Sequence, residues 1–243
     1  RELKKENVDT SLMQIGRGLK TAYSIILLAA EGERTILAYR GAGESLVVQK
    51  VPWKKISAKL VYLDSLYKNL DLLRGAILMK KSCGARIVWN PSQADLDLGL
   101  RKLLPYLQQV DIFIANQEEI SNLLDLPYNQ PKKIFQKFDE LIGGISVMTR
   151  GPDGVMVSDG KTLWDAGIFR ERTIVDRTGA GDAFGSGFAA AWMDKEDIEY
   201  AIRYASANAT RKVENLGAKG GLLKKVEFFK DKRWKKLQVK RII

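Results

Sequence analysis

The most informative stretch of the sequence is residues 174–188, which read Ile-Val-Asp-Arg-Thr-Gly-Ala-Gly-Asp-Ala-Phe-Gly-Ser-Gly-Phe. Gly179, Ala180 and Gly181 carry almost no side chain and lead directly into a predicted helix, so their backbone N–H groups can converge at its positive end. Such a place binds phosphate. Asp182 follows in the first helical turn, where its carboxylate can take a proton from a hydroxyl group held against the anion. A base beside an anion pocket suggests phosphoryl or acyl transfer to an alcohol.

A structural interpretation of the same residues is equally good on spacing alone. The segment 179–182 also fits a tight turn with an Asp favoured by the helix dipole, and Gly185 and Gly187 fit close helix packing. Two other nucleotide-binding motifs are excluded. The chain has no Gly-x-x-x-x-Gly-Lys-Ser/Thr segment, and the spacing from Gly179 to Gly185 misses the dinucleotide motif by one residue.

Short apolar segments alternate with amphipathic ones upstream of this stretch, which predicts a parallel sheet. The expected strands cover residues 60–63, 86–89, 110–115 and 145–149, and the expected helices cover 69–82, 96–107 and 118–124. Turn sequences at 151–154 and 159–160 predict an antiparallel portion with strands 155–158 and 162–164. Helices over about 182–193 and 197–213 should follow. Earlier in the chain, alternation over residues 21–46 with a polar turn at 31–33 predicts a β-hairpin.

The composition is that of a globular α/β chain and excludes several kinds of chemistry. The 243 residues are 45% hydrophobic and 28% charged, and they include no histidine and one cysteine, Cys83. An internal disulfide, a histidine metal ligand and a Ser/His/Asp triad are therefore excluded. The longest strongly apolar run, residues 24–30, is far shorter than the roughly 20 residues of a membrane span, and no apolar leader opens the sequence. We expect a cytoplasmic protein with no membrane partner.

The net charge of +11 is concentrated at the end of the chain. Residues 222–243 hold nine basic and two acidic residues, a net +7. We interpret this tail as a solvated basic face. Nucleic acid is not expected as a partner, because few aromatic side chains lie between the charges.

Residues 176–182 resemble the second signature of the ribokinase (PfkB) family of carbohydrate kinases, Asp-x-Thr-Gly-Ala-Gly-Asp. The resemblance implies an α/β fold with a mostly parallel sheet flanked by helices and a small β lid. The lid portion would be residues 21–46, and residues 1–20 and 47–243 would form the kinase domain. It also implies ATP- and Mg²⁺-dependent phosphorylation of a hydroxymethyl group of a sugar, sugar acid or nucleoside. Asp182 would be the base, and the amides of residues 179–181 would hold the transferred phosphoryl group.

Residues 116–119, Asn-Gln-Glu-Glu, resemble the family's Asn-x-x-Glu motif. The resemblance implies that Asn116 and Glu119 help to bind the nucleotide, and that Glu119 holds Mg²⁺ through water. Few direct carboxylates and several retained waters suit this ion, and strand ends of a parallel sheet are where ligands bind. Read without the family, the pair favours a helix cap with Glu119 as its capping-box partner. With the resemblance, we favour the Mg²⁺ role.

The resemblance implies further nucleotide contacts. The turn at Thr149, Gly151 and Gly154 would lie near the phosphates and ribose, although by itself it is only a hairpin turn. The other positions carried over are Asp176, Asn208 and Gly217. Asn208 would face the adenine, while a packing helix explains it equally well. A monovalent cation is a further cofactor that the family suggests.

The acceptor side is less well specified. The resemblance suggests Tyr39, Arg40 and Asn90 as substrate contacts and a homodimer through the lid, while packing of Tyr23 against Tyr39 across the hairpin is an equally good interpretation. The family's first strand and its Gly-Gly-x-x-x-Asn sugar-binding segment have no equivalent in residues 1–243. This suggests a fragment of a longer protein or an incomplete site. The alternative function is a non-catalytic ribokinase-fold relative that serves as a binding or assembly module.

Overall fold

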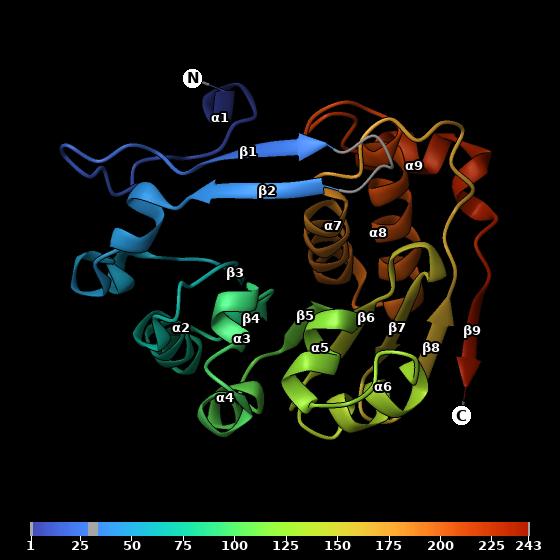
Figure 1. Ribbon diagram of the computed structural model, residues 1–243, viewed down its shortest axis with the longest axis horizontal. Coiled ribbons are helices and arrows are strands. Elements are labelled where there is room, and N and C mark those ends of the chain that lie inside the picture. Colours follow the sequence, from blue (N-terminus) through green and yellow to red (C-terminus); the bar gives the residue numbers. More distant parts are fainter. Residues whose placement is uncertain (1, 29–33, 243) are drawn as a thin grey trace.

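The six strands expected after the hairpin, together with a seventh near the end of the chain, form one sheet in the computed structural model, which describes residues 2–28 and 34–242 (Figure 1). The strands lie side by side in chain order: β3 (Leu60–Leu63), β4 (Arg86–Trp89), β5 (Ile112–Asn116), β6 (Ile145–Thr149), β7 (Val155–Ser158), β8 (Leu163–Ala166) and β9 (Val239–Ile242). Strands β3 to β6 are parallel, and each pairing from β6 to β9 is antiparallel. The parallel part and the antiparallel part thus follow the order that the sequence predicts.

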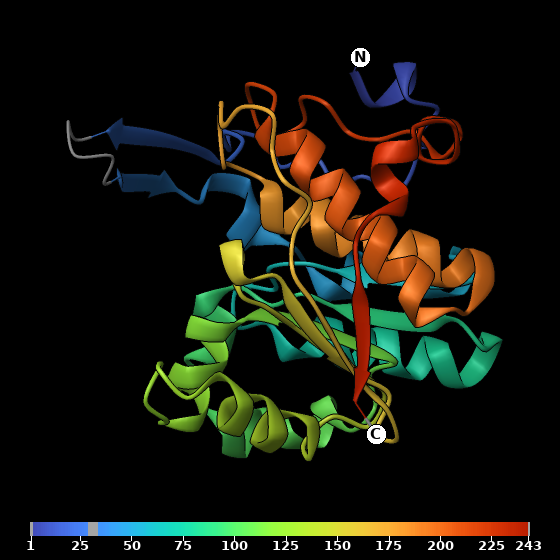
Figure 2. The ribbon, with the colours of Figure 1, turned by 90° about the vertical axis from the view of Figure 1, so that its right-hand side faces the viewer.

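Helices cover both faces of this sheet (Figure 2). The helices of the described residues are α1 (Glu2–Lys5), which lies apart from the sheet, α2 (Leu70–Cys83), α3 (Gln93–Leu96), α4 (Leu100–Leu107), α5 (Gln117–Leu124), α6 (Pro131–Asp139), α7 (Ala180–Lys195), α8 (Ile198–Val213) and α9 (Lys225–Lys230), with short 3-10 helices η1 (Gly41–Ser45), η2 (Val48–Lys50), η3 (Trp53–Lys55), η4 (Gly151–Asp153) and η5 (Lys232–Lys235). Helices α7 and α8 pack on one face, and α2 to α6 pack on the other.

The alternating direction of strand side chains creates one apolar core on each face. In β5, Ile112 and Ile114 point to the α7–α8 side, while Phe113 and Ala115 point to the side of α2 to α6. Strands buried on both faces are continuous apolar runs, as parallel sheets require. Because β3 to β6 are parallel, the residues that follow them gather along one edge of the sheet, beside the start of α7.

A separate two-stranded sheet projects from the body of the molecule (Figure 2). It consists of β1 (Tyr23–Leu28) and β2 (Arg34–Tyr39), which pair antiparallel with Tyr23 opposite Tyr39. This confirms the predicted hairpin, while its expected turn at residues 31–33 lies outside the described residues. Side chains on one face of the sheet are exposed, namely those of Tyr23, Ile25, Leu27, Leu37 and Tyr39.

Three sequence-based expectations need correction. The helix expected over residues 96–107 is two helices, because Gly99 adopts a positive φ of 83° between α3 and α4. Helix α6 was not expected. The basic tail is not simply a solvated face: β9 extends the sheet, and the tail buries Phe228, Trp234 and Leu237 in the core. These three apolar residues are spaced between lysines that stay exposed, which masked their contribution in the sequence.

Candidate active site

The start of α7 has the geometry of an anion-binding site. Gly179, the residue before the helix, has a positive φ of 79°, and a Cβ at this position would lie 2.6 Å from the carbonyl oxygen of Ala218. Only glycine fits both conditions. The amide of Ala180, which the resemblance assigns to the phosphoryl group, donates instead to the carbonyl of Arg177 at 3.2 Å, whereas the amides of Gly181 and Asp182 have no acceptor within the described residues. These two amides, at the positive end of a 16-residue helix, are free to bind an anion.

Asp182 stands directly beside this anion site. Part of the residue faces solvent, but protein atoms crowd its carboxyl group, and this partial burial raises its pKa above the usual value. The negative charge of Asp64, at the carboxyl end of β3, raises the pKa further. A carboxylate with a raised pKa accepts a proton more readily, which suits a general base.

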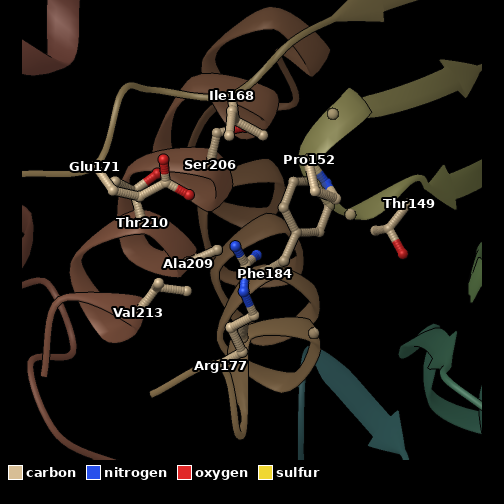
Figure 3. Close-up of a pocket in the computed structure, with 14 residues that line it drawn as sticks. Thr149, Pro152, Ile168, Glu171, Arg177, Phe184, Ser206, Ala209, Thr210 and Val213 are labelled. Atoms are coloured by element: carbon tan, nitrogen blue, oxygen red, sulfur yellow. The ribbon is translucent and has the colours of Figure 1, made fainter. Parts of the chain in front are cut away.

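A pocket of about 330 Å³ opens on one side of the anion site (Figure 3). It is lined by Thr149, Gly151, Pro152, Gly154, Ile168, Glu171, Arg177, Ala180, Gly181, Phe184, Ser206, Ala209, Thr210 and Val213. The Arg177 guanidinium points into the pocket next to the Phe184 ring, and the Glu171 carboxylate lies across from it. An aromatic and aliphatic wall with a cation near helix amides offers places for a flat ring and for phosphates.

The structure brings the predicted turn residues Thr149, Gly151 and Gly154 into this pocket, together with Ala180 and Gly181. Gly154 has a φ of 88°, and a Cβ there would lie 2.0 Å from the carbonyl oxygen of Ala166. The turn therefore passes close to the end of β8.

Asn116 and Glu119 form a helix cap at the start of α5. The Asn116 side chain accepts a hydrogen bond from the Glu119 amide at 2.9 Å, and Glu119 Oε2 accepts one from the Asn116 amide at 2.7 Å. The capping interpretation is thereby confirmed. Asn116 is paired with Thr149 across β5 and β6, so the cap adjoins the pocket. Burial raises the pKa of Glu119, with the neighbouring Glu118 adding to the effect.

The Glu119 carboxylate at the start of α5 suits a Mg²⁺ ion that arrives bound to nucleotide phosphates. Within residues 2–28 and 34–242 there is no group of three or more Cys, Asp or Glu side chains that could hold a metal ion. The cap occupies Oε2 of Glu119, and no hydrogen bond to Oε1 is found in the part of the chain that the structure describes. One carboxylate with a free oxygen fits an ion that keeps most of its waters.

A second polar cluster, whose residues do not line the pocket, lies near enough to Asp182 to be affected by its charge. Tyr62 Oη donates to Asn90 Oδ1 at 3.2 Å, and Asn90 Nδ2 donates to the carbonyl of Ile114 at 3.0 Å. Burial raises the pKa of Tyr62, and the charges of Asp64 and Asp182 raise it further, so the phenol stays protonated. The structure thus places Asn90 in a cluster with Tyr62, and the charge of Asp64 acts on the same phenol.

Besides Asn116 and Glu119, three more predicted nucleotide contacts do not line the pocket. Asn208 is buried: its Nδ2 donates to the carbonyl of Ala183 and its Oδ1 accepts from the Leu223 amide, both at 2.7 Å. Through these bonds the Asn208 side chain joins α8 to α7 and to the loop at Leu223. This arrangement does not support the prediction that Asn208 faces the adenine. The Asp176 carboxylate accepts from the amides of Thr178 at 2.8 Å and Gly217 at 3.0 Å. Asp176 and Gly217 therefore shape the loop before Gly179.

The two predicted lid contacts also have local partners. The Tyr39 ring packs against Tyr23 across the hairpin, with centroids 5.2 Å apart. The Arg40 guanidinium lies over the ring of Tyr67, 5.6 Å from its centroid. The packing interpretation therefore holds for Tyr39.

Sequence reasoning missed several residues that line the site. Arg177 occupies the variable position x of the Asp-x-Thr-Gly-Ala-Gly-Asp motif, and Glu171 and Ile168 lie in an irregular segment without a pattern. Tyr62 and Asp64 lie at the carboxyl end of a predicted parallel strand, which is where ligands bind in sheets of this kind. That signal could have identified them.

The described helices include none that is long and apolar enough to cross a membrane.

Comparisons with known proteins identify the family to which this fold belongs. A model of the pfkB family carbohydrate kinases matches residues 1–225. The ATP-dependent ribose-1-phosphate kinase of Halopiger xanaduensis is 28% identical over 208 residues, and the alignment covers 85% of this chain and 66% of that protein. The chain thus spans slightly less than two thirds of this relative's length.

Solved structures show the same fold. Adenosine kinase from Sinorhizobium meliloti matches with a TM-score of 0.81 at 19% identity, over 94% of this chain and 71% of that one. An E. coli protein described as a ribokinase II, solved with ATP and Mg²⁺, matches with a TM-score of 0.79 at 20% identity, over 94% and 76% of the two chains. The expected ribokinase-like α/β fold is confirmed. With the family model matching most of its residues, the chain belongs to the pfkB family of carbohydrate kinases.

Proposed function

We propose that this protein is an ATP- and Mg²⁺-dependent kinase that phosphorylates a hydroxymethyl group of a sugar, sugar acid or nucleoside. The observation that carries the proposal is the start of α7. There, two free amides and the Asp182 carboxylate adjoin a pocket with an aromatic and aliphatic wall, and the charge of Asp182 also acts on the polar cluster of Tyr62, Asp64 and Asn90. A phosphoryl donor and a hydroxyl acceptor need these two compartments, joined at a base and an anion site.

In the proposed reaction, the acceptor hydroxyl lies against Asp182 on the side of Asn90. As its oxygen attacks the γ-phosphorus of ATP, its proton passes to the Asp182 carboxylate and ADP leaves. The amides of Gly181 and Asp182 donate hydrogen bonds to the phosphoryl oxygens, whose charge they stabilise best in a fixed geometry. Tyr62, held protonated, is a hydrogen-bond donor on the acceptor side, and Arg177 supplies a positive charge on the donor side.

Glu119 would hold Mg²⁺ through water at the edge of the pocket, next to Thr149. When bound, the ion neutralises charge on the nucleotide phosphates. Thr149, Gly151 and Gly154 would lie near the phosphates and ribose, while Asn116 would orient Glu119 through the cap. The ring of Phe184 and the aliphatic side chains of α8 would contact the base.

Residues 21–46 form the lid portion in this proposal, and residues 1–20 and 47–243 form the kinase domain. A lid over the acceptor excludes water, which prevents hydrolysis of ATP in place of transfer. The exposed apolar face of β1 and β2, with Tyr23, Ile25 and Leu37, supports a second proposed role as the contact between two copies of the chain.

Calorimetric titration of Mg-ATP into the protein tests the nucleotide site without knowledge of the acceptor. We expect saturable one-to-one binding. A panel of sugars, sugar acids and nucleosides, assayed by ADP release, then identifies the acceptor. Asp182→Asn should lower turnover about 100-fold or more while Mg-ATP affinity stays nearly constant. Absence of Mg-ATP binding by folded protein would overturn the proposal and favour a non-catalytic role in binding or assembly.

A further inference from the structure

Lys212, on the last turn of α8, is completely buried, with 0% of its side chain exposed. Its Nζ donates to the carbonyl oxygen of Asp176 at 2.8 Å and to that of Asn215 at 3.2 Å, and it lies 3.9 Å from Asp176 Oδ2. Removing an ammonium group from water is costly unless it is paired and hydrogen-bonded. A lysine in this position therefore needs an explanation beyond packing, since an apolar side chain would avoid that cost.

The ammonium group of Lys212 connects the segments that shape the anion site. Asp176 begins the loop that leads to Gly179, and its carboxylate binds the Gly217 amide. Asn215 belongs to the loop that follows α8, and Ala218 in the same loop limits the space at Gly179. The amides of Val175 and Asp176 in turn donate to the carbonyl of Val213 at 2.9 and 3.1 Å. One buried positive charge thus lies between both loops and the end of α8.

The groups around Lys212 Nζ are two backbone carbonyl oxygens and a carboxylate, and they come from two separate segments of the chain. A hard cation takes ligands of this kind. The family resemblance suggested a monovalent cation for this protein. Between these carbonyl oxygens, however, Lys212 Nζ occupies the position that a cation would take. The residues present fit an internal ammonium group rather than an added ion at this place.

We propose that Lys212 is a positioning residue that serves as a built-in cation. Its ammonium group holds the loop from Asp176 to Gly181 in the anion-binding conformation, and nucleotide binding therefore requires no added monovalent cation. The proposal rests on the proposed function, because it assumes that the start of α7 binds the phosphates of ATP.

The test measures the affinity for Mg-ATP by calorimetry and the midpoint of thermal unfolding, in KCl and in tetramethylammonium chloride of equal ionic strength. The tetramethylammonium ion is too large for the position of Nζ. For the wild-type protein, we expect affinities that agree within about 2-fold in the two salts. A wild-type affinity that is about 10-fold higher in KCl would reveal a separate cation site and overturn the proposal.

Two variants separate the charge from the space that the side chain fills. Lys212→Ala leaves room for a small cation, whereas Lys212→Met fills the same space with an apolar chain. In tetramethylammonium chloride, we expect both to bind Mg-ATP about 10-fold or more weakly, since each loses charge-assisted hydrogen bonds. Potassium or ammonium ions should restore affinity and raise the unfolding midpoint of Lys212→Ala but not of Lys212→Met. Retention of wild-type affinity by Lys212→Ala in tetramethylammonium chloride would refute the positioning role.

Lys219→Met is the matched control, because Lys219 is an exposed lysine in the neighbouring loop, paired only with Glu2 in the described residues. It should change neither quantity. If the Lys212 variants do not fold in either salt, the salt dependence of the wild-type protein decides the question. If the wild-type protein binds no Mg-ATP in either salt, the proposed function fails. The salt dependence of the Lys212→Ala unfolding midpoint then still decides whether this site needs a cation.

Discussion

Replacing Gly181 with alanine should stabilise the fold and weaken nucleotide binding at the same time. Gly181 is the second residue of α7, its φ is not positive, and no atom lies within 4 Å of a Cβ built on it. The added methyl group therefore meets no protein atom, and alanine favours a helix over glycine by up to about 1 kcal/mol. The empty space in front of this residue, however, is part of the pocket where we place the phosphates.

A methyl group in that space would hold the phosphate away from the amides of Gly181 and Asp182. Loss of hydrogen bonds to a charged group costs about 1.5–3 kcal/mol, which corresponds to about 10-fold or more in the dissociation constant of Mg-ATP. Calorimetric titration measures this constant, and thermal or urea unfolding measures the stability. Because the two quantities should move in opposite directions, partial unfolding cannot explain the loss of binding.

Gly179→Ala provides the contrasting variant. Its positive φ and the 2.6 Å approach to Ala218 should together lower the free energy of unfolding by about 2 kcal/mol or more. Wild-type affinity for Mg-ATP in a stable Gly181→Ala protein would refute the assignment of the anion site. Lower stability of Gly181→Ala would instead show that the space beside Gly181 is filled by the chain.

Further predictions concern the acceptor side and the loop before α7. The raised pKa of Asp182 places the acidic limb of the activity profile above the usual range of an aspartate, and Asp64→Asn should move that limb to lower pH in a pH–rate profile. Gly185→Ala should lower the free energy of unfolding by about 1–3 kcal/mol, measured in urea, because its Cβ would lie 2.4 Å from Tyr62 Oη. Hydrogen bonds from Thr178 and Gly217 lower the pKa of Asp176 to about 2. The contribution of the Asp176 carboxylate to stability is therefore present above about pH 4 and is lost as the pH falls toward 2. Asp176→Asn should remove this pH dependence of stability, which acid unfolding curves measure.

The sequence predicted most of the fold because the relevant signals lie in consecutive residues. Alternating apolar side chains marked β1 and β2, and the change to apolar runs separated by amphipathic helices marked the parallel strands β3 to β6. Helix breaks were harder to predict. The amphipathic pattern continues through Gly99, and the positive φ of that residue separates α3 from α4.

An anion site at residues 179–182 could also be proposed from the sequence, because small residues, a helix start and a carboxylate occur within four positions, although a tight structural turn fitted the same spacing equally well. The contacts of single side chains farther along the chain could not be predicted. Asn208 was assigned to the nucleotide from its position on a helix, yet both ends of its amide bind backbone groups. The helix pattern predicts which face of α8 Asn208 occupies. The groups that bind its amide, however, come from α7 and from the loop at Leu223.

The sequence by itself predicted the parallel direction of the strands in the first half of the sheet, the hairpin and the glycine-rich start of α7, since each depends on local spacing and on backbone freedom at glycine. Only the tertiary structure decided which distant residues meet there. Tyr62 and Asp64 reach Asp182 because parallel strands end at one edge of the sheet. Lys212 appears in the sequence as one more charge at the end of an amphipathic helix. It becomes a buried cation because two loops, distant along the chain, place their carbonyl oxygens around it.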